Sequence, residues 1–467
     1  MLTSVVLSVV LAAGSPPTDS AYAADLAALA RKYVAEHSSQ EMAFAKVHGA
    51  IPSFARQTGL ACSACHTAFP QLTALGRTFK LNGYTLSGAQ VIQAGDSGQR
   101  ASLKLGLIPP VSAMVVTSLS HTATTPPGTQ NSEAQFPQQL SLFVGGEITP
   151  QIGTFLQLTY SGIDGALGID NAEVRFADHT QLGQKDLLYG LTLNNNPTSQ
   201  DVWNSAPAWR FPFTGSEVAP SPAAAPLLEG ALAQQVAGLG AYAMWNNVLY
   251  AEYTAYRSAP QGGAHPLDAT ATNTIDGVAS YWRAFLQHAW GDQTLMVGGF
   301  GLTAKLIPSG VTGPVNRYTD AGVDAQFERR LGGGMLTAHG SWLHERQQLD
   351  AAFAADAASN AVNTLTALRL DAGVLTASRV GATVGYFNVT GTADDLLYPA
   401  GAVSGSAGRP DSRGVIGELS YMPWLNTRLG AQYVAYNRFN GAATNYDGAG
   451  RNASANNTLY LFAWLAF

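Results

Sequence analysis

The residues most able to do chemistry in this sequence are its only two cysteines, Cys62 and Cys65, and the histidine that follows them, His66. At this spacing, two thiols on one helical turn reach the two vinyl groups of a porphyrin, and the next residue places an imidazole on the iron. A disulfide would not need the histidine, a redox pair would need a thioredoxin-like βαβ pattern, and a zinc site would need a second pair of ligands. The motif therefore predicts one covalently bound c-type haem, with His66 as the proximal iron ligand.

The sixth ligand of the iron has three candidates upstream of the motif, His37, Met42 and His48, of which we retain His48 or Met42. A second histidine would favour a lower reduction potential and a methionine a higher one. We prefer His48, which stands just before a predicted turn, although a solvated surface histidine is an equally good interpretation. Downstream, Arg77 and Lys80 are candidate partners of the haem propionates, with a solvated basic face as the alternative. The sequence identifies no other metal site.

These residues need a small helical domain to position them. Leu72, Leu75 and Phe79 share one helical face, and Asn82-Gly83 is a helix-ending signal. Residues 24–100 carry seven Lys and Arg against four Asp and Glu, a net charge of +3. A domain of this size needs a stabilising cross-link or cofactor in addition to its hydrophobic core, and covalent haem would supply one. We therefore predict a monohaem cytochrome c domain over 24–100.

The first 23 residues are interpreted as a secretory signal peptide. Val5–Ala13 form a short apolar core, and Ala21 and Ala23 supply the small residues of a cleavage site. The apolar stretch is too short to span a bilayer. The mature protein is thus expected to begin near Ala24, outside the cytoplasm.

The rest of the chain, 101–467, alternates between apolar and polar residues. The clearest case is 321–330, where the two kinds separate onto opposite faces: Ala321, Val323, Ala325 and Phe327 against Asp324, Gln326, Glu328 and Arg330. In 151–160 one residue, Phe155, breaks the pattern by falling on the polar face. Strands of about ten alternating residues, joined by Gly- and Pro-rich polar connections such as Ser205–Leu232, are typical of an outer-membrane β-barrel.

Length and charge narrow this interpretation. Some 365 residues at roughly 23 per strand and connection predict about 16 strands, wide enough for a channel or a plug. The haem domain, net positive beside a barrel of net −8, would lie on the periplasmic side or plug the lumen. The whole chain has a net charge of −6 and only 12% charged residues, which excludes a nucleic-acid binder. A soluble β-sandwich or propeller remains the alternative, although the terminal Phe467 is typical of outer-membrane barrels.

Together these features resemble the fused monohaem cytochrome–porin family of the outer membrane, best known from iron-oxidising bacteria. The resemblance is closest in 51–84 and extends into the barrel at Leu193–Trp203, Tyr281–Arg283 and His339–Trp342. It implies electron transfer from an extracellular donor, typically Fe(II), through the haem to a periplasmic carrier such as a soluble c-type cytochrome. The chain would then act as an iron(II):cytochrome c oxidoreductase, if it is an enzyme, and otherwise as an electron carrier in contact with outer-membrane lipid.

Two other functions stay open at this point. The first is a passive porin whose haem domain is a gate or sensor, and its conductance would be unaffected by haem reduction. The second is a soluble periplasmic cytochrome with a β-rich partner domain, which would purify without detergent. The sequence leaves the electron donor, the direction of electron flow and the oligomeric state open.

Overall fold

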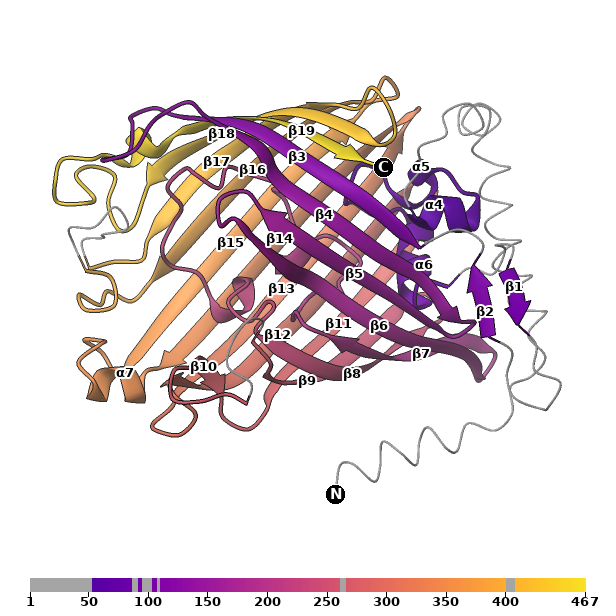
Figure 1. Ribbon diagram of the computed structural model, residues 1–467, viewed down its shortest axis with the longest axis horizontal. Helices are drawn as coiled ribbons and strands as arrows, with labels where there is room; N and C mark the ends of the chain where they lie inside the picture. The colour runs from indigo at the N-terminus through magenta and orange to yellow at the C-terminus, as the bar shows by residue number, and fades with distance from the viewer. Residues whose placement is uncertain (1–52, 86–90, 95–102, 107–109, 261–265, 400–407) are drawn as a thin grey trace.

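The computed structural model describes residues 53–85, 91–94, 103–106, 110–260, 266–399 and 408–467 (Figure 1). Sixteen long antiparallel strands close into a barrel, in which the last strand pairs with the first. The strands are β3 (Val111–Thr122), β4 (Glu133–Thr149), β5 (Ile152–Ser161), β6 (Ala166–Leu182), β7 (Lys185–Asn194), β8 (Val236–Trp245), β9 (Leu249–Ser258), β11 (Ala279–Trp290), β12 (Gln293–Ser309), β13 (Asn316–Leu331), β14 (Gly334–Gln348), β15 (Val362–Leu375), β16 (Val380–Gly391), β17 (Ser412–Tyr421), β18 (Thr427–Arg438) and β19 (Thr458–Ala466). The short β10 (Thr272–Ile275) pairs with β12 outside this ring, because β9 pairs directly with β11. The predicted closed barrel of about 16 strands is confirmed.

The two ends of the barrel differ in their connections. At one end, here called the short-turn end, successive strands are joined by turns of two to five residues, and β3 begins and β19 ends there. At the other, the long-loop end, every connection except the four-residue β5–β6 turn has six residues or more, and the connections include α7 (Asp350–Ala354) and η3 (Ala453–Asn456). This asymmetry is typical of outer-membrane barrels, whose short turns face the periplasm.

The barrel wall has the polarity of a protein that faces lipid. On β13, Val323 is 55% exposed on the outer surface, while Asp324 and Glu328 are buried in the lumen. The same division holds on β17, where Leu419 is 64% exposed and Glu418 is buried. Closed strands satisfy every backbone hydrogen bond internally, as a lipid-facing sheet must. Within the described residues, no helix is long and apolar enough to cross a bilayer.

A charge on this outer surface is expected to destabilise the barrel in lipid. Replacing Val323 by Arg should lower the free energy of unfolding by about 2–4 kcal/mol if the side chain lies near the bilayer midplane. Urea unfolding in lipid vesicles measures the difference, with Val323→Leu as the matched control. Equal stabilities of the Arg and Leu variants would mean that this face does not contact lipid.

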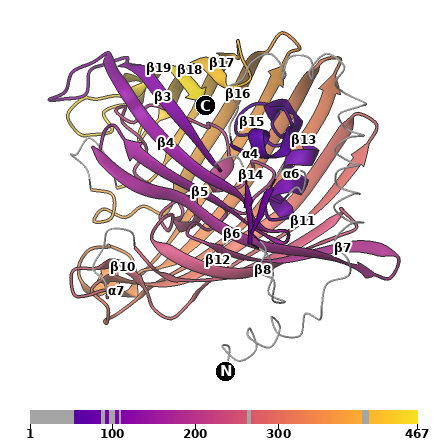
Figure 2. The same cartoon turned by 45° about the vertical axis from the view of Figure 1, so that its right-hand side comes forward.

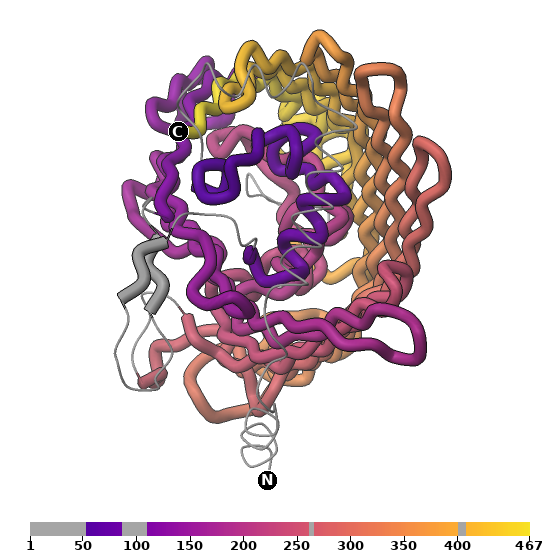
Figure 3. The backbone as a smooth tube through the Cα atoms, turned by 90° about the vertical axis from the view of Figure 1, so that its right-hand side faces the viewer, coloured from indigo at the N-terminus to yellow at the C-terminus, as the bar shows by residue number. Residues whose placement is uncertain are grey.

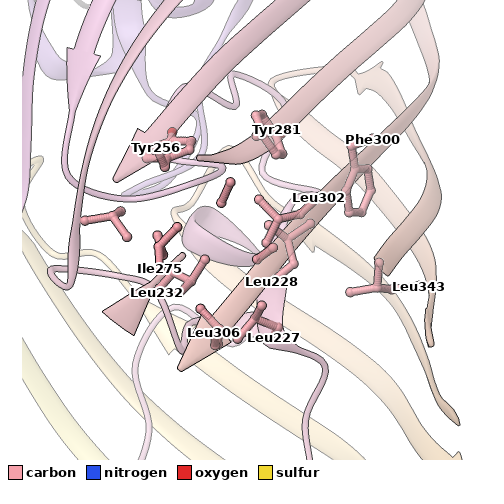
Figure 4. Packing of buried hydrophobic residues seen from close by; sticks show 13 residues of the cluster. Leu227, Leu228, Leu232, Tyr256, Ile275, Tyr281, Phe300, Leu302, Leu306 and Leu343 are labelled. Atoms are coloured by element: carbon pink, nitrogen blue, oxygen red, sulfur yellow. The ribbon is translucent and has the colours of Figure 1, made fainter. Parts of the chain in front are cut away.

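The connection between β7 and β8, residues 195–235, folds into the lumen and is called the inward segment below. Most of it, Ser205–Leu232, is one of the Gly- and Pro-rich polar connections predicted from the sequence, and it does join two strands. Its course into the lumen was not predicted. Its η2 helix (Leu227–Glu229) packs leucines against Tyr256, Ile275 and neighbouring wall residues (Figure 4). The backbone N–H groups of Leu227 and Leu228 donate to carboxylates of the wall, Glu345 and Asp320. Hydrophobic burial and these hydrogen bonds hold the segment inside.

Residues 53–85, called the helical segment below, lie inside the barrel at the short-turn end (Figures 2 and 3). The segment forms α4 (Ser53–Thr58), α5 (Cys62–Cys65) and α6 (Ala74–Leu81). In the chain, a separate hairpin of β1 (Val91–Ala94) and β2 (Leu103–Gly106) follows the helical segment and precedes β3. The predicted helix around Leu75 and Phe79 is thus present, with both side chains buried. The signal peptide and the first part of the predicted haem domain lie outside the described residues.

Candidate functional site

The predicted haem-attachment motif forms a single helical turn that is held by α6. The backbone N–H of His66 donates to the carbonyl of Cys62 at 2.8 Å, which closes the turn. Thr73, the N-cap of α6, donates through its hydroxyl to the carbonyl of Ala64 at 2.6 Å. A Cβ at Gly76 would lie 2.2 Å from the carbonyl oxygen of Cys65, so only glycine lets α6 pack this closely on α5.

Both cysteines are free thiols. Burial raises the pKa of Cys62, and burial together with the charge of Cys62 raises that of Cys65 to about 12. Both side chains therefore stay protonated at neutral pH and resist oxidation to a disulfide, because the thiolate is the reactive form. Two such thiols on one turn remain available for another partner.

The side chain of His66 is half-buried, and its imidazole is neutral. Burial lowers its pKa to about 4, against a smaller opposing effect of the backbone carbonyls of Pro70 and Gln71. Its Nδ1 is buried and makes no hydrogen bond within the part of the chain that the structure describes. The ring packs against Phe69, with 4.5 Å between ring centroids. A neutral imidazole is the form that binds a metal.

The three motif residues line one cavity of about 790 Å³ between the helical segment, the inward segment and the barrel wall. This volume lies in the range of cofactor and ligand sites. Aromatic side chains line much of it, among them Phe54, Phe79 and Phe143. Two thiols, a neutral imidazole with an unpartnered nitrogen and an apolar cavity of this size together fit a covalently bound haem.

Arg77 and Lys80 reach the barrel rather than solvent. The guanidinium of Arg77 donates twice to the carboxylate of Glu328, at 2.8 and 3.0 Å, and lies 3.7 Å from the ring centroid of Trp203. Lys80 donates to the backbone carbonyls of Ser199 and Asp201 at 2.6 and 3.0 Å, and burial lowers its pKa to about 8. Both cations anchor the helical segment, and their interaction with haem propionates stays a prediction.

Further polar contacts fix the helical segment to strands around the lumen. Tyr84 donates to Glu173 on β6 at 2.6 Å, and Tyr242 on β8 donates to the carbonyl of Leu81 at 2.7 Å. On the opposite side Arg428 of β18 donates to the carbonyl of Phe69 at 2.7 Å. The segment is therefore held from several directions and occupies the lumen as a plug.

Small residues on the wall make room for this plug. A Cβ at Gly153 would lie 1.9 Å from the carbonyl oxygen of Gly83, and one at Gly145 would lie 2.8 Å from the Phe54 ring. The contacts of the plug also explain why Phe155 breaks the strand pattern by falling on the polar, lumen-facing side of its strand. Its ring stacks on that of Tyr84, with 5.9 Å between ring centroids, so this aromatic side chain packs against the plug instead of lipid.

The inward segment forms another wall of the cavity through an ion triad. Glu229 accepts from Arg210 at 2.7 Å and from Arg369 of β15 at 2.9 Å. Burial raises the pKa of Glu229, but the two guanidiniums outweigh that effect and lower it to about 2. Both arginines also line the cavity, as do the carboxylates of Asp201 and Asp371.

The triad predicts how acid acts on the inward segment. Because the pKa of Glu229 falls from its ordinary 4.5 to about 2 on folding, its stabilising contribution is complete above pH 4.5 and is lost as the pH falls toward 2. Glu229→Gln should therefore be less stable than the parent at neutral pH, and the difference should shrink below pH 4.5. Urea unfolding at a series of pH values measures it. The carboxyls of Asp320 and Glu345 also face this region, but they are present in both the parent and Glu229→Gln. Their titration therefore cancels when the two proteins are compared.

The two predicted distal ligands, His48 and Met42, lie outside the described residues. Within the described part of the chain, no group of three or more His, Cys, Asp or Glu side chains could hold a metal ion. Sequence reasoning missed the wall residues that hold the plug, above all Glu328 and Trp203. Glu328 was visible only as one of the lumen-facing carboxylates of the 321–330 strand, with nothing to show its partner.

No protein-family model matches the sequence, and no curated protein matches it either. Several solved structures are similar. They include the anion-selective porin from Comamonas acidovorans (11% identity, 76% of this chain and 98% of that chain covered, TM-score 0.45). They also include in-vitro folded OmpT, an outer membrane protein of Vibrio cholerae (12%, 76% and 96%, TM-score 0.41), and the outer membrane channel DcaP of Acinetobacter baumannii (12%, 80% and 100%, TM-score 0.42).

Proposed function

We propose that the chain is an outer-membrane electron-transfer protein that holds one c-type haem inside its barrel. Electrons would pass singly from an extracellular donor, Fe(II) foremost, to a carrier in the periplasm. The observation that carries the proposal is the placement of Cys62, Cys65 and neutral His66 on the wall of one cofactor-sized cavity within the lumen. The lipid-facing outer wall and the short turns at one end support the membrane location.

The chain's own residues would do three things in this function. Cys62 and Cys65 would fix the haem by thioether bonds, and His66 would bind its iron. The helical segment and the inward segment would keep bulk water from the site. When bound, haem supplies a one-electron iron couple, so the reaction needs no general acid, nucleophile or substrate pocket from the protein.

The location of the site gives the proposal its physical reason. Electrons do not cross the lipid of the outer membrane unaided. Oxidation of Fe(II) also yields an insoluble product that is best formed outside the cell. In the proposed reaction one Fe(II) outside loses one electron and becomes Fe(III), and one periplasmic carrier is reduced. A site inside the lumen shortens the path between the two without a second membrane protein.

The test is anaerobic addition of Fe(II) to the haem-loaded protein in detergent, at acid and at neutral pH. Appearance of the reduced haem absorption bands is the expected result. The Cys62→Ala/Cys65→Ala variant is the control for reduction of any free haem. Absence of the reduced bands at every pH would contradict Fe(II) as the donor while leaving the haem site intact.

A passive porin is the second candidate function. A closed 16-strand barrel is the architecture of porins, and the similar solved structures named above include an anion-selective porin and an outer membrane channel. The helical segment opposes this candidate, because it fills part of the short-turn end. A conductance of porin size in planar bilayers that does not change on haem reduction would favour the porin.

A further inference from the structure

One sulfur atom of the barrel wall lies in the same cavity as the haem-attachment motif. Met114 of β3 points into the lumen, is 5% exposed and lines the cavity together with His66. It belongs to none of the clusters of buried hydrophobic side chains that the described residues form. Its thioether is thus buried against the cavity rather than used in core packing.

Strand register places Met114 beside the loop that carries His66. Arg428 of β18 donates to the carbonyl of Phe69, and the Phe69 ring packs on the imidazole of His66. Arg428 pairs with Trp464 of β19, and two residues further along β19, Ala466 pairs with Met114. The loop after α5 therefore rests on the part of the wall that Met114 belongs to.

A second contact ties the helical segment to the same strand. The guanidinium of Arg56, in α4, donates to the carbonyl of Val111, three residues before Met114 on β3. Contacts on both sides of the Cys62–His66 turn thus attach it to β3, through the Arg56 side chain, and to β18, through the carbonyl of Phe69. Met114 faces the cavity between these two attachments.

The chemistry of the iron selects among the cavity residues. With imidazole on one face, the sixth position of a c-type haem is taken by a thioether or by a second imidazole. Among the described residues that line the cavity, Met114 is the only methionine and His66 the only histidine. The amine of Lys80 is already shared between two backbone carbonyls.

We propose that Met114 is the sixth ligand of the haem iron, so that the barrel wall itself completes the coordination. This inference rests on the haem site of the proposed function and goes beyond it, because it replaces the candidates upstream of the motif by a residue of the barrel. Sulfur ligation opposite histidine raises the reduction potential relative to two histidines. Iron ligation would also couple the potential to the seating of the helical segment in the lumen.

The test uses the full-length protein, matured with covalent haem and kept in detergent. The oxidised parent should show the weak sulfur-to-iron charge-transfer band in the far red. Met114→Leu should lose this band, and Met114→His should restore a six-coordinate, low-spin spectrum with a lower midpoint potential. Met42→Leu and His48→Ala are the matched controls, and both should leave the band and the potential unchanged.

The opposite outcomes are separable. Loss of the band in Met42→Leu with its retention in Met114→Leu would overturn the assignment, as would a parent spectrum of two histidines that His48→Ala abolishes. Covalent haem is measured independently on denatured protein, where the iron ligands no longer matter. A parent without covalent haem overturns the proposed function itself, whereas a haem-bearing parent without the sulfur band overturns only the role of Met114. Heat-modifiable gel mobility of each variant reports that its barrel is folded.

Discussion

Cys62→Ala/Cys65→Ala, produced together with a c-type haem maturation system, should carry no covalent haem. The two thiols are the only cysteines of the chain, and thioether attachment has no other route. The parent should stain for haem on a denaturing gel and show the absorption bands of a c-type cytochrome, and the double variant should show neither. The loss is complete rather than graded, which makes it the most decisive measurement on this protein.

His66→Ala separates attachment from ligation in the same experiment. It keeps both thiols, so haem should remain covalently bound, but the iron should lose its proximal ligand and its low-spin spectrum. Heat-modifiable mobility of the folded barrel is the control for all three proteins. Covalent haem in the double cysteine variant, or none in the parent, would contradict the haem site.

Reversing one charge of the Arg77–Glu328 pair should open the short-turn end of the barrel. Arg77→Glu places two buried carboxylates against each other, and breaking a buried ion pair costs about 3–5 kcal/mol. The helical segment is then expected to leave its position in the lumen, and the conductance in planar bilayers should rise severalfold. Protease cleavage within 53–85 should rise in parallel.

The chain offers two controls for this effect. The swapped pair, Arg77→Glu with Glu328→Arg, should restore the low conductance if the ion pair is what holds the plug. Arg438→Gln removes an ion pair with Asp411 at the long-loop end, where the Arg438 side chain is 40% exposed, and should leave the conductance unchanged. A conductance that is the same in the parent and in Arg77→Glu would show that the helical segment does not close the channel.

The barrel could be predicted from the sequence because its signal is local. Period-two alternation needs only neighbouring residues, and the faces assigned to Val323, Asp324 and Glu328 are those that the structure has. The motif at Cys62, Cys65 and His66 is local as well. Strand number followed from length, since each strand of a barrel with short turns uses a similar number of residues.

The contacts that build the site could not be predicted in the same way. Arg77 and Glu328 are 251 residues apart, and the sequence around either residue carries no signal that identifies the other as its partner. The inward turn of 195–235 depends on wall carboxylates that accept from the backbone of Leu227 and Leu228, which composition does not reveal. Its Gly- and Pro-rich sequence is equally compatible with a loop outside the barrel, so the sequence predicts a connection but not its position.

The helical segment also has a consequence for assembly. The barrel closes where β19 meets β3, a pairing between strands more than three hundred residues apart, and contacts of such separation form slowly. The segment touches both sides of this seam, through Arg56 to β3 and through Phe69 to β18. It precedes β3 in the chain, so it is available before the last strand arrives. The helical segment thus bridges the strands on the two sides of the β19–β3 pairing from inside the barrel. A barrel that lacks this segment should close more slowly than the intact protein.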